Sequence, residues 1–94
     1  MRKSLKVFRR LFNEFTSEIQ PLTGIPIVEL TSDTRILIEN HQGVSEFTNE
    51  RISIRVKFGR IVTCGSTLEI AFMSKHQLVI SGQIKTISVE RNRL

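Results

Sequence analysis

The sequence lacks most of the residues that reveal a chemical function by themselves. Its 94 residues contain no Trp, no Tyr and one cysteine, Cys64. One cysteine excludes an intramolecular disulfide and a zinc site built from several thiolates. Only six Phe remain as aromatic rings, which weakens the case for a sheet that binds RNA by stacking bases.

Catalytic and metal-binding motifs are also absent from the sequence. The histidines His41 and His76 lie in predicted turns, and no local spacing places either of them beside Cys64 as a base for a nucleophile. There is no C-x-x-C or H-x-x-x-H spacing for zinc and no glycine-rich phosphate loop. Glu46 and Glu50 flank a predicted turn, which is a common surface pattern. We therefore expect no enzymatic activity, no cofactor and no bound metal.

The chain has no long apolar run. The longest, Ile70 to Met73, is far shorter than the roughly 20 residues that cross a bilayer and the apolar core of about 7–15 residues in a secretory signal. The length suits one domain, and a content of 39% hydrophobic and 24% charged residues is too apolar for a disordered chain. We expect a folded cytoplasmic protein whose contact with any membrane is peripheral.

Residues 3–19 have the spacing of an amphipathic helix. Apolar side chains recur at helical intervals and fall within a stripe of roughly 120°. This stripe consists of Leu5, Phe8, Leu11, Phe12, Phe15 and Ile19. Five bases lie on the other side: Arg2, Lys3, Lys6, Arg9 and Arg10. Pro21 and Gly24 then end the helix, so we assign residues 1–22 to a basic amphipathic helix.

The charges of this segment run against the helix dipole. Bases gather at its start and Glu14 and Glu18 lie in its second half, whereas helix stability favours the reverse order. A basic amphipathic helix is typical of binding to an anionic membrane surface or an acidic protein groove. Alternatively, the apolar stripe packs on the chain's own sheet. The two interpretations are compatible if the stripe packs inward while the bases face a partner. We take the five bases with Phe8, Phe12 and Phe15 as candidate binding residues.

From Ile25 onward the apolar pattern has a period of two, which indicates strands. Apolar and polar residues alternate in 51–58, and Leu68, Ile70 and Phe72 alternate with their neighbours in the same way. Short strands are expected at 26–31, 35–39, 43–48, 51–58, 60–64, 67–73, 77–81 and 83–90. Four of the five glycines lie at predicted strand ends, and the short connections favour antiparallel neighbours. We predict a mainly β domain over residues 23–94, a curved antiparallel meander of seven or eight short strands that forms a roll or an open barrel.

A second basic feature is the polar side of the strand at 51–58. It carries Arg51, Arg55 and Lys57, with Arg60 just past the turn. Such a row could bind phosphates, which leaves nucleic-acid binding as an alternative function. A platform for stacking bases is missing there, because Phe58 falls on the buried side. A solvated sheet face, protected by its charges against aggregation, is the simpler interpretation, and we do not expect nucleic acid as the partner.

The middle and the end of the chain carry an ordered series of strand and glycine positions. The series runs from Arg35-Ile-Leu-Ile-Glu-Asn-His-Gln-Gly-Val44 through Phe47, the Glu50-Arg51-Ile52 strand start and Gly65 with Leu68-Glu69-Ile70, and it ends with Leu78-Val-Ile-Ser-Gly-Gln-Ile84, Ile87 and Val89. This pattern, over roughly residues 27–90, resembles the YabP/YqfC family of endospore-formation proteins. The length and the basic amphipathic N-terminus look more like the YqfC branch.

The resemblance implies a small sporulation protein of the mother-cell cytoplasm, without established catalytic residues. Because family members tend to be encoded beside sporulation membrane proteins, it also implies a membrane-protein partner. We predict a non-enzymatic interaction scaffold, held near an anionic membrane surface or a sporulation membrane protein by its basic helix. Two alternatives stay open. One is a self-assembling β protein, a homo-oligomer that pairs through the final strand Gln83–Glu90 or the first strand from Pro26. The other is a nucleic-acid-binding module that uses Arg51, Arg55 and Lys57.

Overall fold

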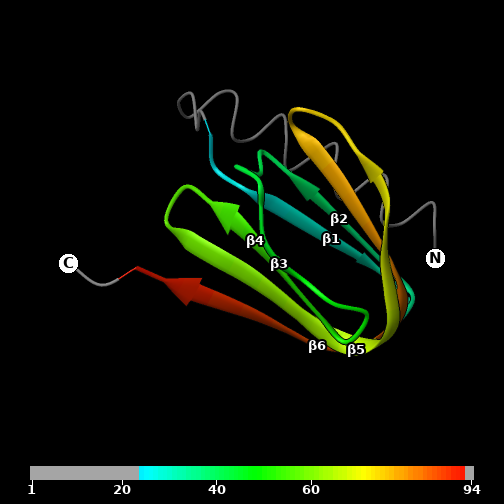
Figure 1. Ribbon diagram of the computed structural model, residues 1–94. Helices are drawn as coiled ribbons and strands as arrows, with labels where there is room; N and C mark the ends of the chain where they lie inside the picture. The colour runs from blue at the N-terminus through cyan, green and yellow to red at the C-terminus, as the bar shows by residue number, and fades with distance from the viewer. Residues whose placement is uncertain (1–23, 93–94) are drawn as a thin grey trace.

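The computed structural model describes residues 24–92, which form one antiparallel sheet of six strands (Figure 1). The strands are β1 Ile27–Thr31, β2 Arg35–Glu39, β3 Val44–Phe47, β4 Arg51–Val56, β5 Gly59–Met73 and β6 Gln77–Arg91. The prediction of a mainly β fold with antiparallel neighbours is therefore confirmed, and the described residues contain no helix. The helix predicted for residues 1–22 lies outside them.

Two strands are much longer than the sequence pattern indicates. β5 and β6 have 15 residues each, whereas the pattern predicts four separate strands in the same stretch of chain. Gly65 and Gly82, which mark the predicted strand ends, lie inside β5 and β6, where the strands bend without ending (Figure 1). The prediction of seven or eight short strands is wrong, because the pairing of β5 with β6 continues through both bends.

The strand order also differs from that of a simple meander. It is β1-β2-β6-β5-β4-β3, so β6 returns to lie between β5 and β2. The β1–β2 and β3–β4 hairpins therefore flank the central β5–β6 hairpin on opposite sides. Within residues 24–92, β1 and β3 each have a single neighbour and form the two edges of an open sheet.

The bend in β5 is held by the turn between β3 and β4. The Gly65 N–H donates to the Glu50 carbonyl oxygen over 3.0 Å, and the Leu68 N–H donates to the Asn49 carbonyl oxygen over 2.8 Å. Glycine is required at the bend because a Cβ on Gly65 would overlap the carbonyl oxygen of Gln83 on β6. The turn and the bend thus lie in direct backbone contact.

The bend in β6 is held in the same way by the turn between β1 and β2. The Gly82 N–H donates to the Thr34 carbonyl oxygen over 3.2 Å, and the Ile84 N–H donates to the Asp33 carbonyl oxygen over 2.8 Å. Gly82 has a φ of +136°, a conformation that other residues rarely adopt. Each outer hairpin therefore fixes one of the two bends of the central hairpin.

The bends fold the sheet over into two layers (Figure 1). The first layer contains β1, β2, residues 77–81 of β6 and residues 69–73 of β5. The second layer contains β3, β4, residues 59–64 of β5 and residues 86–91 of β6. Each layer thus has an inner face toward the other layer and an outer face away from it.

The hydrophobic core lies between the two inner faces. Alternate residues of β2 and β6 face inward from the first layer, and alternate residues of β4 and β5 face them from the second. Burial of each such side chain stabilises the fold by about 1.5–3 kcal/mol. The apolar face of each strand therefore turns inward. The buried cluster consists of Ile36, Ile38, Leu78 and Ile80 with Ile52, Ile54, Val56, Ile61 and Leu68.

A bulge in β5 changes which of its side chains are buried. Ile70 pairs with Ile80 and Phe72 pairs with Val79, so the ladder skips Ala71. An extra residue in one strand reverses the direction of the side chains that follow it. The alternation predicted for this strand therefore fails after Ile70, and Phe72 lies on the outer face, 52% exposed.

Thr63 is a polar side chain inside the apolar core. It is fully buried, and its Oγ1 has no hydrogen-bond partner among the described residues. An unsatisfied buried hydroxyl costs about 1–3 kcal/mol. We expect Thr63→Val to raise the free energy of unfolding by about 1 kcal/mol in urea denaturation. The control is Thr86→Val on the exposed outer face, which should change it by less than about 0.5 kcal/mol; an equal gain in both variants would contradict this account.

Candidate interaction surfaces

The candidate binding residues of the N-terminal segment precede the described part of the chain. They are Arg2, Lys3, Lys6, Arg9, Arg10, Phe8, Phe12 and Phe15, and the structure places none of them. It does place the point where this segment joins the sheet. The Asn40 side-chain amide donates to the Ile25 carbonyl oxygen over 2.8 Å, which fixes the chain just before β1.

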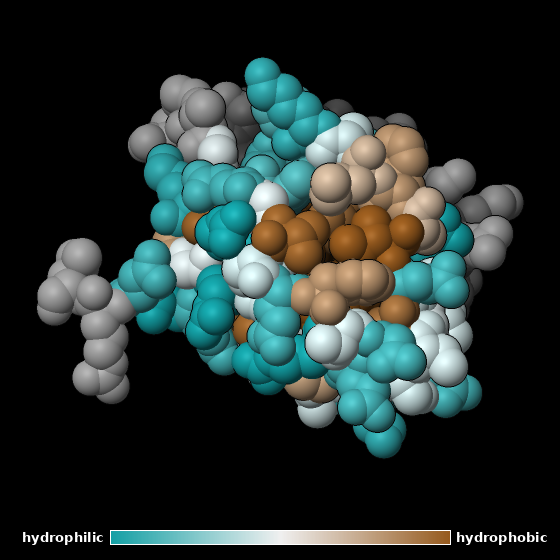
Figure 2. Space-filling view, viewed as in Figure 1, coloured by the Kyte–Doolittle hydropathy of each residue, from teal (hydrophilic) through white to brown (hydrophobic). Residues whose placement is uncertain are grey.

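Apolar side chains are exposed along the open edges of the sheet. β1 exposes Val28 and Leu30, β3 exposes Phe47, and Met73 is exposed at the end of β5. Each of them is in register with a fully buried core residue on the neighbouring strand. The space-filling view shows an apolar area across the middle of one face of the molecule (Figure 2). The apolar side chains at the edges of the core are therefore accessible to a partner.

Three arginines share the outer face of the second layer. In the β4–β5 ladder, Arg55 lies opposite Arg60 and Arg51 lies opposite Cys64. Lys57 follows β4 in the turn that leads to β5. The structure thus places Arg51, Arg55 and Arg60 together on the face away from the core, as their spacing in the sequence indicates.

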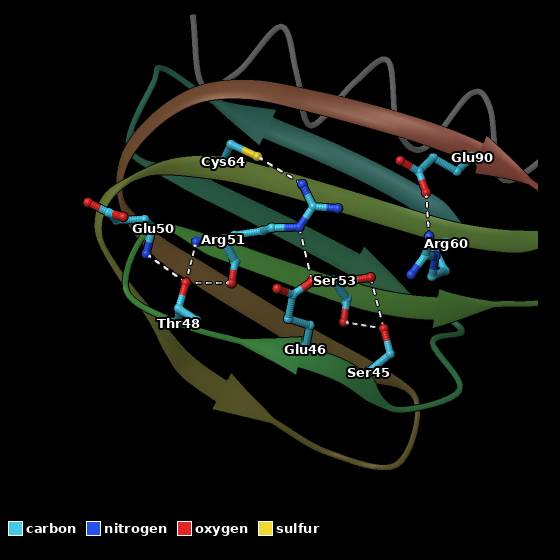
Figure 3. Close-up of polar contacts among 9 residues, drawn as sticks. All are labelled: Ser45, Glu46, Thr48, Glu50, Arg51, Ser53, Arg60, Cys64 and Glu90. Atoms are coloured by element: carbon cyan, nitrogen blue, oxygen red, sulfur yellow. Dashed lines mark hydrogen bonds and ion pairs between the residues drawn. The ribbon is translucent and has the colours of Figure 1, made fainter.

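Carboxylates reduce the positive charge of this arginine row (Figure 3). Arg51 Nε donates to Glu46 Oε1 over 3.0 Å, and Arg60 Nη2 donates to Glu90 Oε1 over 2.8 Å. The hydrogen bond to Glu46 and its negative charge raise the pKa of the Arg51 guanidinium, because both favour the charged form. Two of the three arginines are thus paired within the sheet, and the row attracts phosphates less than its sequence indicates.

Hydroxyl groups fix the strands that carry the arginine row (Figure 3). Thr48 Oγ1 accepts hydrogen bonds from the N–H groups of Glu50, over 3.2 Å, and Arg51, over 2.9 Å, in the β3–β4 turn. The Ser45 hydroxyl donates to Ser53 Oγ over 2.8 Å, and Ser53 is fully buried. The polar groups of this face mainly hold β3 against β4.

Two described residues with nucleophilic or basic chemistry, His41 and Cys64, make structural contacts. His41 Nε2 lies 2.7 Å from the Ser74 carbonyl oxygen, and its Nδ1 accepts a hydrogen bond from the Gly43 N–H over 3.1 Å. This pattern fits a neutral ring with its proton on Nε2. Arg51 Nη1 lies 3.8 Å from Cys64 Sγ. Within residues 24–92, no three His, Cys, Asp or Glu side chains are arranged to hold a metal ion.

The outer face of the first layer carries an apolar row. Leu37 of β2, Val79 of β6 and Phe72 of β5 lie side by side in register across three strands. The same face carries three acids and one base, which are Glu29, Glu39, Glu69 and Arg35. We call this surface the acidic apolar face. Sequence patterns do not reveal it, because it depends on the pairing of β6 with β2 and on the bulge before Phe72.

The sequence of this sheet matches a known family model. The YabP family model covers residues 26–93 of the chain. The chain belongs to the YabP family. No curated protein and no solved structure matches it. The resemblance to the YabP/YqfC family is thereby confirmed, and the assignment to the YqfC branch stays a prediction.

The YabP match begins just before β1 and extends past β6. The family is therefore recognised here by the two-layered sheet, and the basic segment of residues 1–22 precedes it. In the part of this YabP-family chain that the structure describes, no helix is long and apolar enough to cross a membrane. The part of the chain that the family model matches therefore offers the faces and edges of its sheet as candidate interaction surfaces.

Proposed function

We propose that this YabP-family chain is a non-enzymatic sporulation protein that acts as a small interaction scaffold. The observation that carries the proposal is the exposed apolar surface of the edges. Phe47 and Met73 are 54% and 56% exposed, and Val28 and Leu30 are 38% and 45% exposed. Strand edges with exposed apolar side chains are surfaces to which another protein can bind. Family membership supports the sporulation setting.

A role without catalysis is supported by the contacts of the reactive side chains. His41 Nε2 joins the β2–β3 connection to Ser74 just after β5, and its Nδ1 accepts from the Gly43 N–H within that connection. Cys64 lies beside the guanidinium of Arg51, which in turn binds Glu46. These contacts hold strands and turns together and leave no obvious pair of nucleophile and base among them.

We also propose that the N-terminal segment holds this scaffold near an anionic membrane surface or a sporulation membrane protein in the mother-cell cytoplasm. Five of the 14 bases lie within the first ten residues. Each base near an anionic surface contributes about 1 kcal/mol, and salt weakens this attraction. The arginine row is a weaker anchor, because Glu46 and Glu90 pair with two of its members.

Vesicle flotation tests the membrane part of this proposal. The full chain should float with vesicles that contain anionic lipid and remain unbound with neutral vesicles. Replacing all five N-terminal bases by Gln should weaken the affinity for anionic vesicles at least about tenfold, because a loss of 1.4 kcal/mol already has this effect. High salt should produce a similar loss in the unchanged chain.

A matched variant controls for net charge in the flotation experiment. It replaces five bases of the sheet by Gln: Arg35, Arg55, Lys75, Lys85 and Arg91. This variant loses the same formal charge and should float like the unchanged chain. Equal loss of binding in both variants, or equal binding to neutral and anionic vesicles, would remove the electrostatic anchor from the proposal.

Self-assembly is a second candidate function, favoured by the free strand edges. Within the described residues, β1 and β3 have one neighbour each, and β6 pairs with β5 alone after its bend. Such edges can pair with the same edge of a second copy. A monomeric mass by light scattering over a broad concentration range would argue against this candidate.

A further inference from the structure

The acidic apolar face has no layer of strands or helices over it within the described part of the chain. Residues 24–92 form only the two layers of one folded sheet, so they provide no third layer over Leu37, Val79 and Phe72. Phe72 is 52% exposed there, whereas Val79 is buried and Leu37 is partly buried. Apolar sheet faces in folded domains pack against another element, so an occupant for this face must come from elsewhere.

Charge distinguishes this face from the outer face of the second layer. The acidic apolar face carries Glu29, Glu39 and Glu69 against Arg35. The outer face of the second layer instead carries the three arginines of the arginine row against two glutamates. An occupant that is both apolar and basic therefore fits the first layer and is disfavoured on the second.

We propose that the acidic apolar face is the docking site of the chain's own N-terminal segment, residues 3–19. This segment has a stripe of six apolar residues that matches the row on the sheet. At 100° per residue, Arg9 lies about 40° beyond one border of the stripe and Glu18 lies about 20° beyond the other. Lys6 and Arg10 lie on the side opposite the stripe. Residues 3–19 carry four bases and two acids, a net charge of +2, so docking brings a net positive segment onto the net negative face. The bases opposite the stripe stay on the far side, toward a membrane or an acidic partner.

The point of attachment makes this docking geometrically feasible. The chain enters the sheet at β1, the edge strand of the first layer, where Asn40 holds Ile25. Residues 20–23 separate the apolar stripe from Gly24 and can span about 13 Å when extended. A helix of this length measures about 25 Å, whereas four strands are about 14 Å wide. The segment can therefore cross the whole first layer in one pass.

Paramagnetic broadening in the full chain, without lipid, tests this docking. Cys64 is changed to Ser, and a nitroxide label is attached after Gln77→Cys on the acidic apolar face or after Ser88→Cys on the outer face of the second layer. The amide signals of residues 5–19 should lose most of their intensity with the label at position 77 and little with the label at position 88. Equal broadening from both labels, or from neither, would overturn the proposal.

A mixing experiment identifies the copy that provides the segment. Untagged chains labelled with ¹⁵N are mixed with tagged chains that carry the nitroxide at position 77. Broadening should be lost in this mixture, because the label and the segment then belong to different chains. Broadening that persists would assign the segment to a second copy and overturn docking within one chain.

Hydrogen exchange provides a second measurement with matched variants. Phe72→Ser removes the exposed ring of the row, and exchange of residues 5–19 should accelerate about tenfold, since lost burial of this size corresponds to about 1.4 kcal/mol. Val89→Ser, which changes a residue that is 63% exposed in the second layer, should leave this exchange unchanged. Equal exchange in all three chains would contradict the docking, whatever the result of vesicle flotation.

Discussion

Gly65→Ala and Gly82→Ala are each expected to lower the free energy of unfolding by about 3–5 kcal/mol. A Cβ at Gly65 would overlap the carbonyl oxygen of Gln83, and a Cβ at Gly82 would lie 2.5 Å from that of Thr67. Both obstacles are backbone atoms of the facing strand, so no side-chain rotation relieves them. A domain of this size has about 5–15 kcal/mol of stability in total, so each substitution removes a large part of it.

Urea denaturation measures this loss, and Ser66→Ala is the control next to the bend. The Ser66 hydroxyl donates to the Gln83 side chain at the surface over 3.2 Å, so its removal should cost about 1 kcal/mol or less. If Gly65→Ala were as stable as Ser66→Ala, the close approach of β5 and β6 at the bend would not be essential to the fold.

Ile54→Ala is expected to lower the free energy of unfolding by about 2–5 kcal/mol. Ile54 is fully buried at the centre of the second layer, where it is in register with Ile61 of β5 and Val44 of β3. Truncation leaves a cavity between the two layers of the sheet, whose backbones are fixed by their ladders and cannot collapse around it. Thermal unfolding should show a decrease of about 4–8 °C in Tm for each kcal/mol.

Val89→Ala is the matched control for this truncation. Val89 is also in register with Ile61, on the other side of β5, but it is 63% exposed. Its truncation removes little buried surface and should shift stability by less than about 1 kcal/mol. Equal decreases in the two variants would show that the core is not centred between the layers as described.

Local sequence patterns predict the strands with one wet and one buried face. In β4 the apolar residues Ile52, Ile54 and Val56 alternate with polar ones, and all three are buried. The same reasoning fails at Gly65 and Gly82, because a glycine between two apolar stretches is equally compatible with a turn and with a bend. The choice depends on hydrogen bonds from turns that lie about 15 residues or more away in the chain, which a local pattern does not contain.

The surfaces, like the bends, depend on contacts between distant strands that a local sequence pattern does not contain. Alternation within one strand places Arg51 and Arg55 on a common face, but it does not show that Glu90, 30 residues after Arg60, pairs with Arg60. The acidic apolar face is less predictable still, since it combines four strands and depends on a single bulged residue in β5. The family resemblance, in contrast, is visible in the sequence because it rests on the order of strands and glycines along the chain.

The two long strands have a consequence for how the sheet can open. β5 and β6 pass through both layers, and each bend is bonded to the turn of one outer hairpin. Neither layer can detach without breaking the ladder of the other, so we expect residues 24–92 to unfold as one cooperative unit. A partner that stabilises one face is therefore expected to slow the opening of amides throughout the sheet, in the second layer as well as in the first.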